Sequence, residues 1–167
     1  NVIYNAIGTY SVKLEASNAF GADSITKIGY IQVVNSYNMC TGTTSTSASA
    51  GNLFDSGGPN GSYQNSENCQ FLINPGCTGT ISVTFSQFVT ESCCDQLSVY
   101  NGTNTSAPLL GYYSGSTIPP TLYASSGKML FVWNTDGSVT SNGFAATWTS
   151  TLSGTVPPVA SFSVSTT

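Results

Sequence analysis

ISVTFSQFVTESCCDQLSVYNG, residues 81 to 102, contains two β-strand patterns that are separated by a short polar segment. The stretches 80–88 and 96–102 both read as strands, and the second ends in a turn. Glu91 and Asp95 flank two adjacent cysteines in the segment between them. The chain of 167 residues has only 7 acidic side chains, so two of them four residues apart indicate a specific purpose.

The same pattern continues outward from this stretch. Further strands are predicted at 69–75, 121–137 and 143–150, with Gly, Pro and Asn between them. No segment combines a helical period with helix caps. Many short strands with turns at this spacing predict an all-β antiparallel sandwich or jelly roll.

The N-terminal region has its own strand pair. Residues 8–21 place Tyr10, Val12, Leu14 and Ala16 on one face, and 24–34 returns as a second strand. A two-stranded hairpin is marginal in water, so we expect another element to cover it. Residues 35–66 are polar, and we expect a linker followed by an irregular entry loop there.

Composition excludes several classes of function. Only 6% of the residues are charged, the net charge is −4, and the basic residues are 3 Lys with no Arg. This argues against nucleic acid and anionic membranes as partners. No apolar run is long enough to span a membrane, so we expect no membrane insertion. Five cysteines in a Ser-, Thr- and Asn-rich chain favour an oxidising, extracytoplasmic location, and the lack of His and of CxxC pairs disfavours zinc.

Several blocks over residues 40–150 resemble a CUB domain, which is a two-sheet jelly roll. These are GSYQNSENCQFLI, the opening stretch 81–102, and LLGYYSGSTIPPTLYASSGKMLFVWNTDGSVTSNGFAATW, in the family's order and spacing. The resemblance implies a first disulfide between Cys40 and Cys69.

The remaining cysteines depart from the family pattern. Tyr113 stands at the fourth family cysteine, Cys94 stands at a family Tyr, and Cys77 is additional. We expect a Cys77–Cys94 bridge, with Cys77–Cys93 as the alternative. The cysteine left over would be free, in a vicinal bridge, or paired with another chain.

The segments on both sides resemble parts of PKD domains, which are Ig-like β-sandwiches. Residues 4–33 resemble the C-terminal half of such a domain, and 157–167 resemble the first strand of another. We therefore expect four parts: a PKD-like half at 1–35, a CUB-like domain at 36–152, a linker at 153–158 and a strand at 159–167. Exchange of that strand between molecules would give end-to-end self-association.

Three acidic residues match the calcium ligands of calcium-binding CUB domains. The resemblance implies that Glu91, Asp95 and Asp136 bind Ca²⁺ and that Tyr63 supports them. Three converging carboxylates without a Lys or Arg repel one another, and a hard cation with oxygen ligands removes that repulsion. Gly137, Ser138 and Asn142 could complete the ligand shell. The alternatives are scattered surface acids or a carboxylate pair for glycoside hydrolysis.

The function expected from these observations is binding. We expect a non-enzymatic, secreted or cell-surface adhesion or recognition module of a larger multidomain protein, resembling large bacterial surface proteins. Its partners would be an extracellular protein or glycan and the neighbouring PKD- and CUB-like domains of the same precursor. The alternatives are a substrate-targeting module of a secreted hydrolase and a passive spacer in a surface filament.

Overall fold

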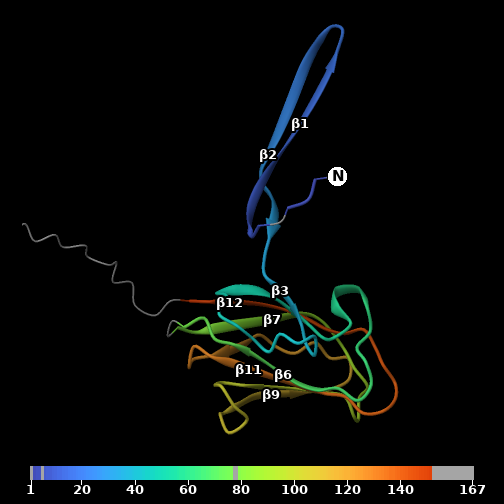
Figure 1. Cartoon of the computed structure of the whole chain (residues 1–167), viewed down its shortest axis with the longest axis vertical. Helices are drawn as coiled ribbons and strands as arrows, with labels where there is room; N and C mark the ends of the chain where they lie inside the picture. Colours follow the sequence, from blue (N-terminus) through green and yellow to red (C-terminus); the bar gives the residue numbers. More distant parts are fainter. Residues whose placement is uncertain (1, 5, 77–78, 152–167) are drawn as a thin grey trace, which may run out of the picture.

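A computed structural model of the chain describes residues 2–4, 6–76 and 79–151, which form three β-sheets. Two five-stranded sheets make a sandwich, and a two-stranded hairpin projects from it (Figure 1). The predicted all-β sandwich is therefore confirmed. Among the described residues no helix is long and apolar enough to cross a membrane.

One sheet of the sandwich has the strand order β10-β7-β12-β5-β3. Strand β3 runs parallel to β5, and the other neighbours are antiparallel. A single 3-10 turn, η1 (Gly58–Asn60), follows β5. The strands are β3 (Ser36–Asn38), β5 (Ala50–Phe54), β7 (Ile81–Val89), β10 (Leu122–Ala124) and β12 (Gly143–Ser150).

The facing sheet has the order β4-β6-β11-β8-β9. Strand β4 runs parallel to β6, and the other pairs are antiparallel. A disulfide joins Cys40, just after β3, to Cys69 in β6, so it connects the two sheets. The strands are β4 (Ser45–Thr46), β6 (Asn68–Ile73), β8 (Gln96–Tyr100), β9 (Leu109–Tyr113) and β11 (Met129–Asn134).

The core lies between these sheets and consists mainly of aromatic and aliphatic side chains. Trp133 and Trp148 are buried, and their indole N–H groups donate to Glu67 Oε2 and the Ala48 carbonyl. Buried indoles need such partners, so both residues are satisfied. Close packing of this kind supplies most of the stability of a sandwich. Further fully buried residues are Leu53, Phe71, Ile81, Leu97, Phe131 and Phe144.

The structure corrects the expectation for residues 35–66. This segment is not a linker with an irregular loop, because it supplies β3, β4 and β5 and the buried side chains of Met39, Leu53 and Tyr63. These strands have two to five residues and are rich in Ser, Asn and Ala. A pattern so short and polar gives no clear period, which explains the error.

The predicted strand 121–137 is also wrong as a single element. It divides into β10, which pairs with β7, and β11, which pairs with β6 and β8 in the facing sheet. The turn between them contains Gly127 with a φ of 70°. That left-handed conformation suits glycine and lets the chain cross from one sheet to the other.

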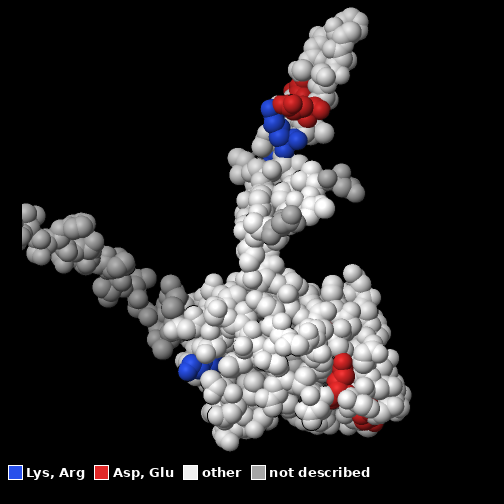
Figure 2. Space-filling model, viewed as in Figure 1, with Lys and Arg blue, Asp and Glu red and all other residues white. Residues whose placement is uncertain are grey.

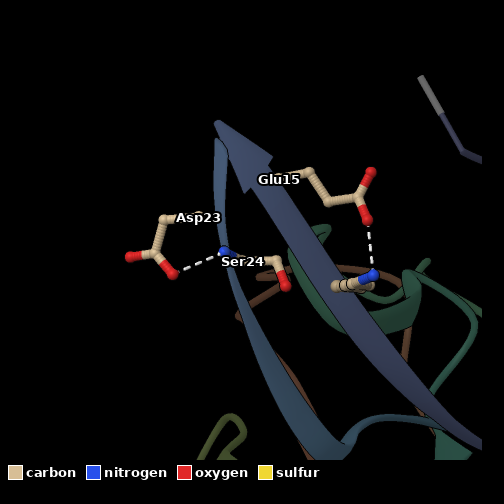
Figure 3. A network of polar contacts seen from close by, with 4 residues as sticks. Glu15, Asp23 and Ser24 are labelled. Atoms are coloured by element: carbon tan, nitrogen blue, oxygen red, sulfur yellow. Dashed lines mark hydrogen bonds and ion pairs between the residues drawn. The ribbon is translucent and has the colours of Figure 1, made fainter. Parts of the chain in front are cut away.

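The hairpin consists of β1 (Gly8–Asn18) and β2 (Gly21–Val33) in antiparallel register. Near its tip Asp23 accepts from the Ser24 N–H, and farther from the tip an ion pair joins Lys13 to Glu15 along β1 (Figure 3). Much of its apolar surface is open, including Leu14, Phe20, Ile25 and Ile28. The expected linker 153–158 and strand 159–167 lie outside the described residues.

Candidate metal centre

Three acidic side chains from two loops meet at one end of the sandwich. Glu91 follows β7, Asp95 precedes β8, and Asp136 follows β11. One carboxylate oxygen from each lies within 4.8 Å of the others. The structure thus brings together all three residues that the sequence predicted as metal ligands.

Asp95 is the fixed member of the group. It is fully buried, and its Oδ1 accepts the Asp136 backbone N–H at 2.9 Å. Its Oδ2 accepts the Tyr63 hydroxyl at 2.5 Å. Both carboxylate oxygens of Asp95 are therefore held in a defined orientation.

Glu91 has the opposite environment. Its Oε2 is buried and has no hydrogen-bond partner among the described residues. Burial, together with the charges of Asp136 and Asp95, raises the pKa of Glu91. A buried acceptor without a donor is costly, and a cation between the carboxylates would satisfy it.

Tyr63 links the site to the core. The residue is fully buried, and its ring packs edge-on against Trp133. Its hydroxyl donates to Asp95 and accepts the Glu91 backbone N–H at 3.1 Å. Burial and the hydrogen bond to Asp95 raise the pKa of Tyr63 to about 12. Tyr63 therefore has the supporting position that the sequence suggested.

The turn between the first two acids holds the adjacent cysteines. The structure joins Cys93 to Cys94, so neither forms the expected bridge to Cys77. Cys77 itself lies outside the described residues. The turn places the sulfur atoms of Cys93 and Cys94 beside each other, so a disulfide between them forms without help from any other segment of the chain.

The additional ligands expected after Asp136 are only partly in position. The Ser138 N–H donates to Asp136 Oδ1 at 2.9 Å, which fixes that carboxylate. The Asn142 carbonyl accepts from Gln87 Nε2 at 2.6 Å. For Gly137 and Asn142, the described part of the chain shows no contact with the three carboxylates.

Val139 was missed by the sequence prediction. Its carbonyl lies 3.4 Å from the Tyr63 hydroxyl, beside the acidic group. Its φ is 57°, a conformation that a β-branched residue rarely adopts. Rare backbone conformations cluster at functional sites, and nothing in the pattern NTDGSVTSNG distinguished this residue.

The charge distribution leaves the acidic group without a basic partner. Lys128 is the only basic residue in the sandwich, because Lys13 and Lys27 belong to the hairpin. Figure 2 shows basic surface at one end of the sandwich and acidic surface at the opposite end. Among the described residues the one salt bridge is in the hairpin. A mobile cation is therefore the available source of compensating charge.

A second buried acid, Asp55, was not singled out from the sequence. Its two oxygens accept the Gly57 N–H at 2.8 Å and the Phe144 N–H at 2.7 Å. Desolvation raises its pKa to about 6 despite these bonds. A Cβ at Gly143 would lie 2.0 Å from Asp55 Oδ2, so the glycine is needed for this close approach. Asp55 connects the segment after β5 to strand β12 through these hydrogen bonds, and it is not one of the three acids of the candidate metal centre.

Comparison with known proteins identifies the central domain. The family model described as "CUB domain" matches residues 40–148. Cubilin of Sus scrofa is 38% identical over 97 residues, which is 56% of this chain and 3% of cubilin. The zinc metalloproteinase nas-39 of Caenorhabditis elegans is 34% identical over 134 residues, 75% of this chain and 14% of that protein. The chain thus spans a small part of these relatives.

Solved structures share the fold. The MASP-1 CUB2 domain bound to Ca²⁺ has a TM-score of 0.56 at 18% identity, covering 66% of this chain and 99% of that domain. The extracellular region of zebrafish Gpr126/Adgrg6 has a TM-score of 0.57 at 24% identity, covering 68% and 15%. The relatives named here are animal proteins rather than the bacterial surface proteins suggested by the flanking segments, and the matched family model does not extend into those flanks.

Proposed function

Because the chain belongs to the CUB family, we propose that Glu91, Asp95 and Asp136 bind one Ca²⁺ ion in an extracellular recognition module. CUB domains with disulfides are typical of extracellular proteins, and cubilin and MASP-1 use them as binding modules of multidomain proteins. The observation that carries the proposal is the convergence of three carboxylates, one with a buried and unpartnered oxygen.

The donor set fits a hard cation. Ca²⁺ takes about six to eight oxygens in flexible geometry, whereas Mg²⁺ needs a nearly ideal octahedron. Three carboxylates from two loops, with the Val139 carbonyl close by, suit the more flexible ion. The similarity to a Ca²⁺-bound MASP-1 domain supports the same choice.

The module acts by binding rather than by catalysis in this proposal. Ca²⁺ holds the two loops together, and the remaining negative charge attracts a cationic group of the ligand, such as a lysine of a protein or an amino group of a glycan. Among the described residues none of the three acids forms a salt bridge, so their charge is available to a cationic ligand group. Complementary charge of this kind contributes mainly to specificity and association rate.

The hairpin belongs, in this proposal, to a neighbouring Ig-like domain of the PKD type. Its support is the open apolar surface of Leu14, Phe20, Ile25 and Ile28 on a sheet of only two strands. Such a sheet is not stable in water by itself. A further β-domain on this side would bury that surface.

The test is thermal unfolding of the full chain in millimolar Ca²⁺ and in chelator. At a hundredfold excess over the dissociation constant, Ca²⁺ contributes about 2.7 kcal/mol. That corresponds to a midpoint higher by about 5–10 °C for a domain of this size. Asp136→Asn should lose most of this shift because it removes one ligand charge.

A matched control is available in the hairpin. Asp136 accepts the N–H of Ser138, and Asp23 accepts the N–H of Ser24 in a similar local contact (Figure 3). An Asn preserves such a contact, so Asp23→Asn changes charge outside the site. Wild type and Asp23→Asn should respond equally to Ca²⁺. If Ca²⁺ leaves the wild-type midpoint unchanged, the proposal is wrong and the acids are surface charge.

A further inference from the structure

We propose that the Cys93–Cys94 disulfide is a thiol-exchange site and that its reduction weakens Ca²⁺ binding by the carboxylates on either side of it. This inference rests on the proposed function. The disulfide joins neighbouring residues within the turn that separates Glu91 from Asp95. One atom from each of Glu91, Cys93 and Cys94, a carboxylate oxygen and the two sulfurs, lies within 4.8 Å of the others.

The disulfide is open to attack. Cys93 is exposed and Cys94 is half-buried, in contrast to the fully buried Asp95 next to them. An exposed disulfide is the kind that small thiols can reach. The chain therefore places an accessible redox group inside the loop that carries two of the three candidate ligands.

The rest of this loop is fastened at its ends. The Thr90 N–H donates to the Gly115 carbonyl, and the Thr90 hydroxyl accepts the Gly115 N–H and donates to the Asp95 carbonyl. Ser114 Oγ donates to the Ser92 carbonyl at 3.0 Å. Among the described residues Cys93 and Cys94 form no side-chain hydrogen bond, and their disulfide is a covalent constraint in the middle of the turn.

The constraint acts on the geometry of the ligands. Glu91 and Asp95 repel each other, and a free turn would let the Glu91 side of the loop move away. The disulfide restricts the backbone of both central residues and so keeps the turn in a compact form. Holding ligands in their bound arrangement before binding lowers the entropy cost of binding.

Reduction proceeds by ordinary exchange with a small dithiol. A dithiol thiolate attacks the exposed Cys93 sulfur, the Cys93–Cys94 bond breaks, and Cys94 leaves as a thiolate that takes a proton from water. The second dithiol sulfur, as its thiolate, then attacks the mixed disulfide. Cys93 is released as a thiol after protonation, and the dithiol is oxidised to its disulfide, so two electrons pass to the protein.

Thermodynamic linkage gives a second, independent readout. If the oxidised domain binds Ca²⁺ more tightly than the reduced domain, Ca²⁺ must favour the disulfide by the same factor. In a dithiothreitol redox buffer, Ca²⁺ should therefore lower the equilibrium ratio of reduced to oxidised Cys93–Cys94. We expect a factor of about ten, within the usual range of such couplings.

The experiment compares three states of the full chain by calorimetric titration with Ca²⁺: oxidised, reduced by dithiothreitol, and oxidised Cys93→Ser/Cys94→Ser. The reduced protein and the double variant should both have a dissociation constant about ten times that of the oxidised wild type. Alkylation and mass spectrometry of the 93–94 peptide measure the redox ratio with and without Ca²⁺.

The double variant also separates the two disulfides, because it keeps Cys40 and Cys69. Dithiothreitol should not weaken its Ca²⁺ binding further, and a further loss would assign the effect to Cys40–Cys69 and overturn the inference. A double variant that binds Ca²⁺ as tightly as the oxidised wild type would also overturn it. An oxidised wild type that binds no Ca²⁺ would reject the proposed function and this inference together.

Discussion

Tyr63 connects the hydrophobic core to the candidate metal centre. Its ring packs against Trp133, and its hydroxyl contacts both Asp95 and the Glu91 backbone. The resemblance to CUB domains suggested a supporting role for Tyr63. In the structure its hydroxyl lies between the Asp95 carboxylate and the Glu91 backbone N–H. The position of one hydroxyl therefore sets the relative position of two candidate ligands.

Tyr63→Phe should cost about 1–3 kcal/mol of stability in urea unfolding, because it leaves a buried carboxylate oxygen and the Glu91 N–H without a partner. It should also weaken Ca²⁺ binding. Tyr37→Phe is the matched control, since the Tyr37 hydroxyl accepts from Thr46 Oγ1 away from the site. The control should leave Ca²⁺ affinity unchanged, and an equal loss in both variants would contradict a specific role for Tyr63.

Asp55 makes the stability depend on pH. Its pKa is about 6 in the folded chain against an ordinary value of 3.8, so between these values the folded state binds more protons than the unfolded state. Stability should therefore fall as pH rises from about 4 to 6 and then level off, with a total change on the order of 1–3 kcal/mol. Urea unfolding across this range in chelator checks it.

The control for Asp55 is Asp55→Asn, which cannot ionise. Its slope between pH 4 and 6 should be smaller than that of the wild type. It should also be less stable overall, because one amide oxygen cannot accept both the Gly57 and Phe144 N–H groups as the carboxylate does. An unchanged slope would assign the pH dependence to other acids.

At the scale of elements, the two disulfides have different tasks. Cys40–Cys69 closes a separation of 29 residues and connects the two sheets, whereas Cys93–Cys94 spans a single residue step. In the chain-entropy description, stabilisation grows with the length of the closed loop. The Cys40–Cys69 disulfide therefore stabilises the whole sandwich, whereas the Cys93–Cys94 disulfide restricts only the turn that contains it.

Cys40→Ala/Cys69→Ala should lower the free energy of unfolding by about 3–4 kcal/mol. Cys93→Ser/Cys94→Ser should lower it by only about 1 kcal/mol when both are measured in chelator, because its loop is so short. Urea unfolding of both double variants makes the comparison. Equal losses would show that the short disulfide also holds elements together.

For the whole molecule, the sandwich should be independent of the hairpin. Residues Gln32, Val34 and Asn35 lie beside Ser49 and Ala50 at the base of the hairpin, and the rest of it projects away (Figure 1). A chain without residues 1–34 should keep its unfolding midpoint within a few degrees and keep its response to Ca²⁺. A large loss in differential scanning calorimetry would make the hairpin part of the same folding unit.

The hairpin deletion also addresses association. An open apolar surface of this kind favours contact with other molecules. If the full chain associates through the hairpin, its sedimentation coefficient should rise with concentration, and the shortened chain should remain monomeric. Concentration-dependent sedimentation in both chains would place the contact on the sandwich instead.

Local patterns in the amino-acid sequence predicted the β class, the hairpin and the three acids of the candidate centre. These follow from local features: the alternation of Tyr10, Val12 and Leu14, and acidic residues at the family positions in a chain with few charges. A strand's own alternation reflects which of its side chains face the core, so it can be read without knowing the neighbouring strands.

The way in which these elements combine became visible in the folded chain. The division of 121–137 between two sheets and the burial of Asp55 both depend on which distant segments meet. Residue 55 contacts residue 144 and residue 63 contacts residue 95, separations that no local pattern encodes. Such contacts are fixed by the packing of the two sheets as a whole, and this is the physical reason that they appear only in the folded chain.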